Sequence, residues 1–254
     1  LAAADYERLV ANTRQLLDSL VQLPEVRRRD AAACNALLAR LKSGYTQYVN
    51  LGAIGPDARV FCSAVPTTFR ADVSDRAYYH RALETRDFAI GDFQIGRITH
   101  QPVVVFSYPD FDTAGQLQTM AFASLDLTWL NQIAVTAQLP AGSTITLFDG
   151  QGVILSRYPD TEKWIGQSRK DAPLTRIILS ERREGTANET GLDGVPRLYA
   201  YAPLLAGVAG GGVYLSVGIP RDIAFADVTR IFTHTFAGLA IVALLVFAAA
   251  WVGG

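Results

Sequence analysis

The chain has 254 residues, half of them hydrophobic, and a formal net charge of −1 at pH 7. This length is sufficient for two modest hydrophobic cores or one large one, and the near-neutral charge gives no electrostatic footprint for nucleic acid. The sequence also lacks nucleophile-elbow, zinc-protease and phosphate-loop motifs and any Cys/His cluster, so we expect no catalytic residue, metal or cofactor within it.

Two helices are predicted at the N-terminus. Residues 3–23 carry apolar side chains at spacings of three, four and seven, a broad stripe that should pack on the body of the protein. A near-heptad subset could instead face a second copy of the chain in a homodimer: Tyr6, Val10, Thr13, Leu17 and Leu20. A second helix is predicted over 30–42, with Asp30 as its N-cap and Gly44 as its stop.

From residue 45 the hydrophobic period changes from helix to strand. Alternating residues at 45–54 and 58–65 flank a GPDA turn and predict a hairpin. A helix over 75–86 follows, and then strands near 88–95, 102–108 and 117–126 and a helix over 127–138. Pro140 marks the predicted domain boundary.

The same order of elements begins again after Pro140. Strands over 143–149 and 152–157 flank DGQG, a tight-turn signal. A loop and helix then occupy 160–183, and three strands follow near 185–190, 195–202 and 212–219. The sequence therefore predicts an α+β chain with two tandem antiparallel-sheet domains after a long N-terminal helix.

The C-terminal stretch over 232–252 contains no acid, Lys or Arg. At about 1.5 Å per residue, a helix of this length reaches roughly 30 Å, the thickness of a bilayer's hydrocarbon core. We predict a transmembrane helix here, continuous with a linker helix from about Arg221. A buried core helix is the alternative, but it explains less well why the stretch is apolar all round and ends on Trp251.

The only two cysteines, Cys34 and Cys62, predict a disulfide, since an even number in a membrane-tethered domain is typical of an oxidising compartment. In the chain-entropy account this bond would stabilise the fold by about 3.5 kcal/mol. Two unrelated buried thiols are the alternative.

Four segments, in this order and spacing, resemble the double Cache (dCache) sensors of bacterial transmembrane receptors: YVNLGAIGPDARVFCSA, SDRAYYHRAL, ASLDLTWLN and LFDGQGVILSRYPD. Such sensors precede histidine kinases, diguanylate cyclases and chemoreceptor signalling modules. The resemblance implies a helical region over 1–42, a membrane-distal Cache or PAS-like domain over 43–138, a membrane-proximal one over 139–220, and a linker helix and transmembrane span over 221–252. It also implies a homodimer in the bacterial inner membrane, with the sensing region in the periplasm.

In that family the membrane-distal domain usually holds the ligand. The subfamily that binds amino acids uses an Arg-x-aromatic-aromatic segment for the carboxylate and an acid at the end of a later strand for the ammonium group. Arg76, Tyr78 and Tyr79 match the segment and Asp126 matches the acid. A guanidinium can bind a carboxylate with two hydrogen bonds, and a tyrosine offers a hydroxyl on an apolar wall.

Structural roles are the alternatives for all of these residues. Tyr78 and Tyr79 are adjacent and point about 100° apart on a helix, so at least one could be ordinary core. Arg76 could bridge to Asp72 or Asp75, and Asp126 could simply cap the helix predicted at 127–138.

Three positions depart from the amino-acid-binding pattern: Ala71 replaces a tyrosine, and Gln94 and Gly96 replace a tyrosine and an aspartate. Half of the amine cage is missing, which favours a carboxylate-bearing or other small polar metabolite over an α-amino acid. Strand position makes four more residues candidates for the pocket lining, although each is also typical of plain core: Phe93, Phe106, Ser107 and Tyr108.

The sequence therefore predicts extracytoplasmic sensing of a small molecule, bound in the distal domain, and signalling across the membrane. The alternative is a sensor or dimerisation module that binds a protein partner and no small molecule. Its distal pocket would be filled by the chain's own side chains.

Overall fold

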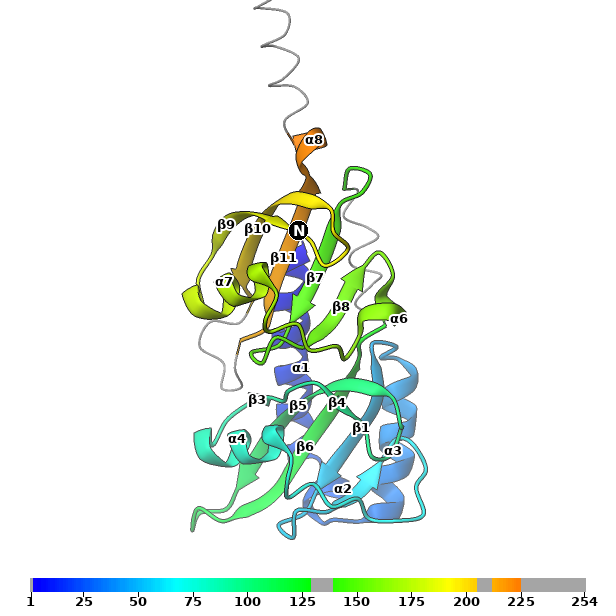
Figure 1. Cartoon of the computed structure of the whole chain (residues 1–254). Coiled ribbons are helices and arrows are strands. Elements are labelled where there is room, and N and C mark those ends of the chain that lie inside the picture. Colours follow the sequence, from blue (N-terminus) through cyan, green and yellow to red (C-terminus); the bar gives the residue numbers. More distant parts are fainter. Residues whose placement is uncertain (1, 129–138, 205–211, 225–254) are drawn as a thin grey trace, which may run out of the picture.

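The structure is a computed structural model of the chain, and it describes residues 2–128, 139–204 and 212–224. Two antiparallel sheets lie one beyond the other along the long axis, and one long helix runs beside both (Figure 1). We call the first sheet with its helices the distal domain. We call the second sheet with its helices the proximal domain. The helix α1 begins beside this sheet, and α8 follows its last strand.

The long helix α1 (Ala2–Gln22) joins the two domains through one continuous hydrophobic core. Leu17 and Val21 are fully buried, and the same core includes Ile145 and Leu215 of the second sheet. The predicted packing of α1 on the body is confirmed. The near-heptad subset is buried within the chain itself, so this stripe is not available to a second copy, and a homodimer would need another surface.

Two shorter helices, α2 (Pro24–Arg27) and α3 (Ala31–Ser43), lead into the first sheet. A carboxylate oxygen of Asp30 accepts a hydrogen bond from the backbone N–H of Ala33 (3.1 Å), so Asp30 is the N-cap, as predicted. A disulfide joins Cys34 of α3 to Cys62 of β2, the pair that the sequence predicted. It fixes α3 to the edge of the first sheet.

The N-cap gives a first prediction. Replacing Asp30 with alanine should lower the free energy of unfolding by about 1 kcal/mol, since one N–H at the start of α3 loses its acceptor. Denaturant unfolding of the full chain measures the change. Asp30→Asn is the matched control because asparagine also caps helices well. An alanine variant as stable as the wild type would show that the cap contributes nothing.

The distal sheet has the strand order β2-β1-β6-β5-β3, and β4 also pairs with β5. Its elements are β1 (Tyr48–Ile54), β2 (Val60–Ser63), α4 (Ala77–Thr85), β3 (Ala89–Ile90), β4 (Gln94–Ile95), β5 (Pro102–Phe111) and β6 (Leu117–Asp126). The hairpin and the two long strands are confirmed. The strand predicted over 88–95 is instead two short strands separated at 91–93.

The proximal sheet repeats this order as β8-β7-β11-β10-β9, which confirms the repeat of pattern seen in the sequence. Its elements are β7 (Thr144–Phe148), β8 (Ile154–Tyr158), α6 (Thr161–Trp164), α7 (Pro173–Glu181), β9 (Gly185–Thr190), β10 (Pro196–Pro203), β11 (Tyr214–Pro220) and α8 (Arg221–Ala224). The helical region predicted at 160–183 contains two helices, of which α7 is the longer.

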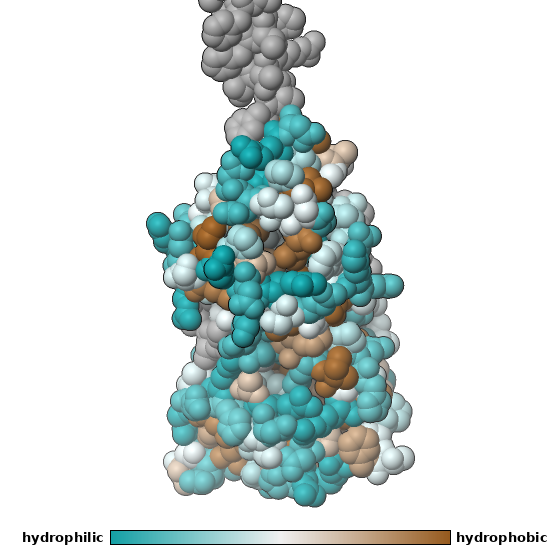
Figure 2. All heavy atoms as spheres, in the orientation of Figure 1, coloured by the Kyte–Doolittle hydropathy of each residue, from teal (hydrophilic) through white to brown (hydrophobic). Residues whose placement is uncertain are grey.

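Alternating side chains give the distal sheet two different faces. Val104 and Phe106 of β5 belong to the core shared with α1, whereas Val103 and Val105 belong to a second core under α4. The surface in view is mostly hydrophilic over the distal domain (Figure 2).

Two of the predicted helices cannot be compared with the structure. Residues 129–138 of the helix predicted at 127–138, and the whole stretch predicted to span a membrane, lie outside the described residues. Within the described ranges, no helix combines the length and the hydrophobicity that a membrane crossing requires.

Candidate functional site

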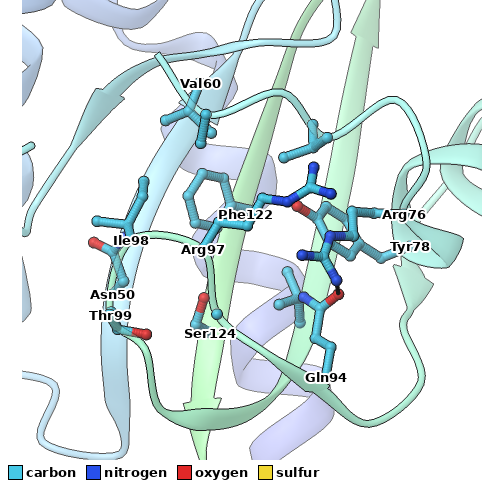
Figure 3. Close-up of a pocket in the computed structure, with 14 residues that line it drawn as sticks. Asn50, Val60, Arg76, Tyr78, Gln94, Arg97, Ile98, Thr99, Phe122 and Ser124 are labelled. Carbon is cyan, nitrogen blue, oxygen red and sulfur yellow. Dashed lines mark hydrogen bonds between the residues drawn. The ribbon is translucent and has the colours of Figure 1, made fainter. Parts of the chain in front are cut away.

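A cavity lies in the distal domain between the start of α4 and the face of the sheet opposite α1 (Figure 3). It encloses about 370 Å³ not occupied by protein atoms, part of it open to solvent. The lining comprises two arginines, no carboxylate, and otherwise polar and apolar residues: Asn50, Val60, Ala71, Val73, Arg76, Tyr78, Gln94, Gly96, Arg97, Ile98, Thr99, Val105, Phe122 and Ser124.

Arg76 projects into this cavity from the N-cap position of α4. Its backbone is extended (φ −88°, ψ 132°), which points the side chain across the sheet toward β4. One terminal nitrogen donates a hydrogen bond to Oε1 of Gln94 (3.1 Å), and Nε lies 3.7 Å from a carboxylate oxygen of Asp75 (Figure 3). The local bridge to Asp75 is therefore present, but it is long. The other terminal nitrogen has no partner among the described residues and can bind a ligand.

Arg97 ties the segment after β4 to the loop before α4. Its two terminal nitrogens lie 2.9 and 2.7 Å from the two carboxylate oxygens of Asp75, and it also donates to the carbonyl oxygen of Asp72. Burial alone would raise the pKa of the Asp75 carboxyl, but the hydrogen bond from Arg97 and the nearby charge of Arg76 lower it overall. Asp75 thus stays ionised and neutralises chiefly Arg97, so the cavity keeps excess positive charge.

Polar groups lie on the other side of the cavity from Arg76 (Figure 3). The side-chain oxygen of buried Asn50 accepts hydrogen bonds from Ser63 Oγ and Val65 N, both 3.1 Å, which leaves its amino group as a donor. The buried Thr99 hydroxyl has no hydrogen-bond partner within the part of the chain that the structure describes. Because a buried hydroxyl without a partner is unfavourable, Thr99 marks a position for a ligand atom or a water molecule.

Apolar side chains form the rest of the wall. The ring of Phe122 lies over Gly52, where an added Cβ would be only 2.3 Å from the ring carbons, so glycine is required for this packing. Tyr78 is buried beside the two arginines, and burial raises the pKa of its phenol above the ordinary value. Tyr78 is therefore a neutral hydroxyl against an apolar surface.

The structure brings three of the sequence-predicted residues together at the cavity: Arg76, Tyr78 and Gln94. The positions that depart from the amino-acid-binding pattern, Ala71, Gln94 and Gly96, all line it as well. The three positions that lack the amine-binding residues of the amino-acid pattern are therefore part of the cavity wall.

Two further predicted residues lie behind the wall. The Ser107 hydroxyl is buried and donates to the carbonyl oxygen of Tyr78 (3.0 Å), which anchors the start of α4 on β5. Tyr79 is buried in the core under α4, with its ring edge-on to that of His80. Neither side chain lines the cavity.

Three other predicted pocket residues do not line this cavity. Tyr108 and Phe106 lie on the α1 side of β5, since the alternation of the strand turns them away from the cavity. Phe93 also packs in that shared core and reaches the proximal domain, where its ring would clash with any Cβ on Gly166.

Asp126 also lies outside the cavity lining. One of its carboxylate oxygens accepts hydrogen bonds from the backbone N–H (2.8 Å) and the hydroxyl (2.7 Å) of Thr128. This is the local arrangement that the capping alternative implied.

Sequence reasoning missed four polar residues of the site: Arg97, Asn50, Thr99 and Ser124. Only Arg97 carried a usable signal, because it directly follows Gly96, one of the departing positions. Asn50 and Thr99 reach the cavity through pairing of distant segments, which spacing does not reveal. Among the described residues, no group of acidic, histidine or cysteine side chains could hold a metal ion.

Comparison with known proteins places this geometry in a family. The family model described as Cache domain, dCache_1, matches residues 1–228. A search of curated protein sequences gives no significant match.

Similar solved structures cover most of the chain. The extracellular domain of rpHK1S-Z16, described as a histidine kinase, has a TM-score of 0.76 at 20% identity, over 88% of this chain and 92% of that one. The ligand-binding domain of the Pseudomonas aeruginosa PAO1 amino acid chemoreceptor PctB, solved with L-arginine, has a TM-score of 0.69 at 19% identity, over 89% and 93%.

The ligand-binding domain of the Pseudomonas fluorescens chemoreceptor CtaA, solved with L-alanine, has a TM-score of 0.65 at 19% identity, over 88% of this chain and 94% of that one. These likenesses show a shared fold. Together with the family match over most of its length, they establish that the chain belongs to the dCache_1 family of Cache domains.

Proposed function

We propose that this chain is the periplasmic sensing region of a receptor in the bacterial inner membrane, and that it binds a small carboxylate in the distal cavity. Its family consists of non-catalytic sensor modules. The observation that carries the ligand class is the cavity wall, which has two arginines, no carboxylate and one partly neutralised guanidinium directed inward.

The charge balance of the wall favours an anion over a zwitterion. Asp75 accepts two short contacts from Arg97 but only a 3.7 Å contact from Arg76, so a ligand carboxylate would complete the pairing of Arg76. An ammonium group, by contrast, would meet Asn50, Thr99 and Ser124 without an ionised acceptor. A hydroxyl or carbonyl oxygen suits these neutral groups better.

A route for the signal leaves the cavity at β4. Gln94 contacts Arg76, and the backbone N–H of its neighbour Phe93 donates to a carboxylate oxygen of Asp149 (3.3 Å). Asp149 is buried at the β7–β8 turn, and burial raises its pKa. We propose that ligand binding shifts the 91–99 segment and, through this turn, the paired strands β7 and β11.

Beyond β11 the proposed route runs through α8 into residues 232–252, which we propose cross the membrane. In a homodimer, a shift of an ångström or two between the two copies of this C-terminal helix could be transmitted to the cytoplasmic side of the membrane. A ligand produces such a shift only if it binds the two conformations of the chain with different affinities.

A thermal-shift titration of the full chain in detergent tests the proposal. The panel contains small mono-, hydroxy- and dicarboxylates, their neutral amides and alcohols, and α-amino acids. At 100 times its Kd a ligand stabilises the fold by about 2.7 kcal/mol, so we expect a carboxylate to raise Tm by about 5 °C or more. Neutral analogues should have no effect.

Hydrogen exchange on the same complex tests the route. Amides of the 91–99 segment and of the turn at 149–153 should both become better protected. If no carboxylate shifts the Tm of the folded chain, direct sensing fails, and a module that binds a protein partner becomes the better explanation. If only the distal amides respond, the proposed route is wrong.

A further inference from the structure

A second cavity lies in the proximal domain, at the position that corresponds to the distal one in the repeated fold. It lies between the start of α7 and the open face of the second sheet, and encloses about 400 Å³, including open solvent. Its lining combines one arginine, hydroxyl groups and apolar side chains: Thr146, Phe148, Arg157, Ala172, Pro173, Leu174, Thr175, Thr190, Gly191, Leu192 and Tyr199.

The proximal cavity differs from the distal one in that its positive charge is almost fully buried. The side chains of Arg157 and Arg197 are only 3% and 4% exposed, and Asp193 is shared by both. Arg197 forms a two-bond pair with Asp193 (2.6 and 2.9 Å), whereas a terminal nitrogen of Arg157 lies 3.3 Å from it. Among the described residues, two guanidinium groups thus share one carboxylate, and Arg157, the less well paired, lines the cavity.

A buried cation whose only counter-charge is shared with a second cation is incompletely compensated, so Arg157 calls for a further partner. Its other contacts are neutral: a hydrogen bond to the Thr146 hydroxyl (2.9 Å) and the face of the Trp164 ring, 5.2 Å away. Burial lowers the pKa of Arg157, the direction expected of a guanidinium that lacks full compensation.

The start of α7 supplies further donors to the cavity wall. Thr175 is only 1% exposed and lines the cavity, so its hydroxyl is a further donor at this wall. Ala172 offers no side-chain cap, so the first N–H groups of α7 are left for another acceptor. The positive end of the helix macrodipole points the same way.

We propose that this cavity is a second ligand site, specific for a small monocarboxylate with a short aliphatic chain. One excess positive charge matches a monoanion. The carboxylate would lie between Arg157 and Thr175, with its chain against Phe148, Leu174 and Leu192. A multiply charged, strongly hydrated anion such as phosphate would find too few donors and an apolar wall.

Trp164 makes this site observable by itself. We would use the full chain in detergent with Trp129 and Trp251 replaced by phenylalanine and excite tryptophan selectively, so that the signal comes from Trp164, next to Arg157. Arg76→Met in the same chain removes the proposed carboxylate-binding group of the distal site. Titration with butyrate should give a saturable change in Trp164 emission, and butan-1-ol should give none.

Two variants test the assignment. Thr175→Val removes one hydroxyl at nearly constant volume and should weaken butyrate binding about tenfold. Arg157→Met should weaken it about 100-fold, and the valine variant keeps the test valid if the methionine variant does not fold. The proposal fails if butyrate causes no saturable change in the folded chain, if phosphate binds more tightly than butyrate, or if Thr175→Val leaves the affinity unchanged.

Discussion

Replacing Arg76 with methionine should lower the affinity of the full chain for the proposed carboxylate ligand about 100-fold, or about 3 kcal/mol. The guanidinium is the least neutralised cation on the distal wall, with one bond to Gln94 and one long contact to Asp75. Methionine keeps most of the side-chain volume, so the loss would report the missing charge and hydrogen bonds. Isothermal titration with the strongest carboxylate of the panel measures it.

Two further variants make the Arg76 result specific. Arg76→Lys keeps the charge but loses the planar two-bond geometry, so its affinity should fall between those of the wild type and the methionine variant. Arg70→Met is the control because Arg70 is 53% exposed, pairs with Asp57 on the surface and lies outside the cavity. It should bind normally. An unchanged affinity in a folded Arg76→Met chain would remove Arg76 from the site.

The fold could be predicted largely from local signals. Spacings of three and four predicted α1, Asp30 predicted the start of α3, and the GPDA and DGQG turns predicted the two hairpins. The repeat of these signals after Pro140 predicted two sheets, which the structure shows with the same strand order. Each signal acts over a few residues, which is why it can be read without knowing the tertiary structure.

The site was harder to predict because its residues depend on which face of a strand they occupy. The break at 91–93 turns Phe93 to the shared core while Gln94 reaches the cavity, so a continuous strand over 88–95 gave the wrong environment for Phe93. Tyr108 lies outside the cavity for a simpler reason, since only alternate residues of β5 face α4. Arg76 and Tyr78 lie together at the cavity because both belong to one short segment at the start of α4.

The two cavities hold their arginines at different depths. The Arg76 side chain is 20% exposed and lines the distal cavity. Arg157 is almost fully buried and already shares Asp193 with Arg197. The distal arginine is therefore suited mainly to binding, whereas the proximal cluster also stabilises its domain.

That structural role leads to the largest expected loss of stability. Asp193→Asn should lower the free energy of unfolding by about 3 kcal/mol at neutral pH, because two buried guanidinium groups lose their carboxylate. We expect a value at the lower end of the range for buried pairs because the Asp193 side chain is 34% exposed and partly screened by solvent. Denaturant unfolding of the full chain measures the loss.

The pH dependence distinguishes this charge effect from a simple packing defect. Burial alone would raise the pKa of Asp193, but hydrogen bonds from Arg197 and the backbone of Val195 and the charges of both arginines hold it at about 2, below its ordinary value of 3.8. The folded state therefore binds this proton less readily than the unfolded one. Its contribution is complete above about pH 4 and is lost as the pH falls toward 2.

The wild type and Asp193→Asn should thus converge in stability between about pH 4 and pH 2, since asparagine does not titrate in this range. Asp57→Asn is the matched control: Asp57 pairs with Arg70, but both side chains are about half exposed, so its loss should cost no more than about 0.5 kcal/mol. A difference for Asp193→Asn that stays constant across this pH range would mean that shape, and not the shared charge, stabilises the proximal cluster.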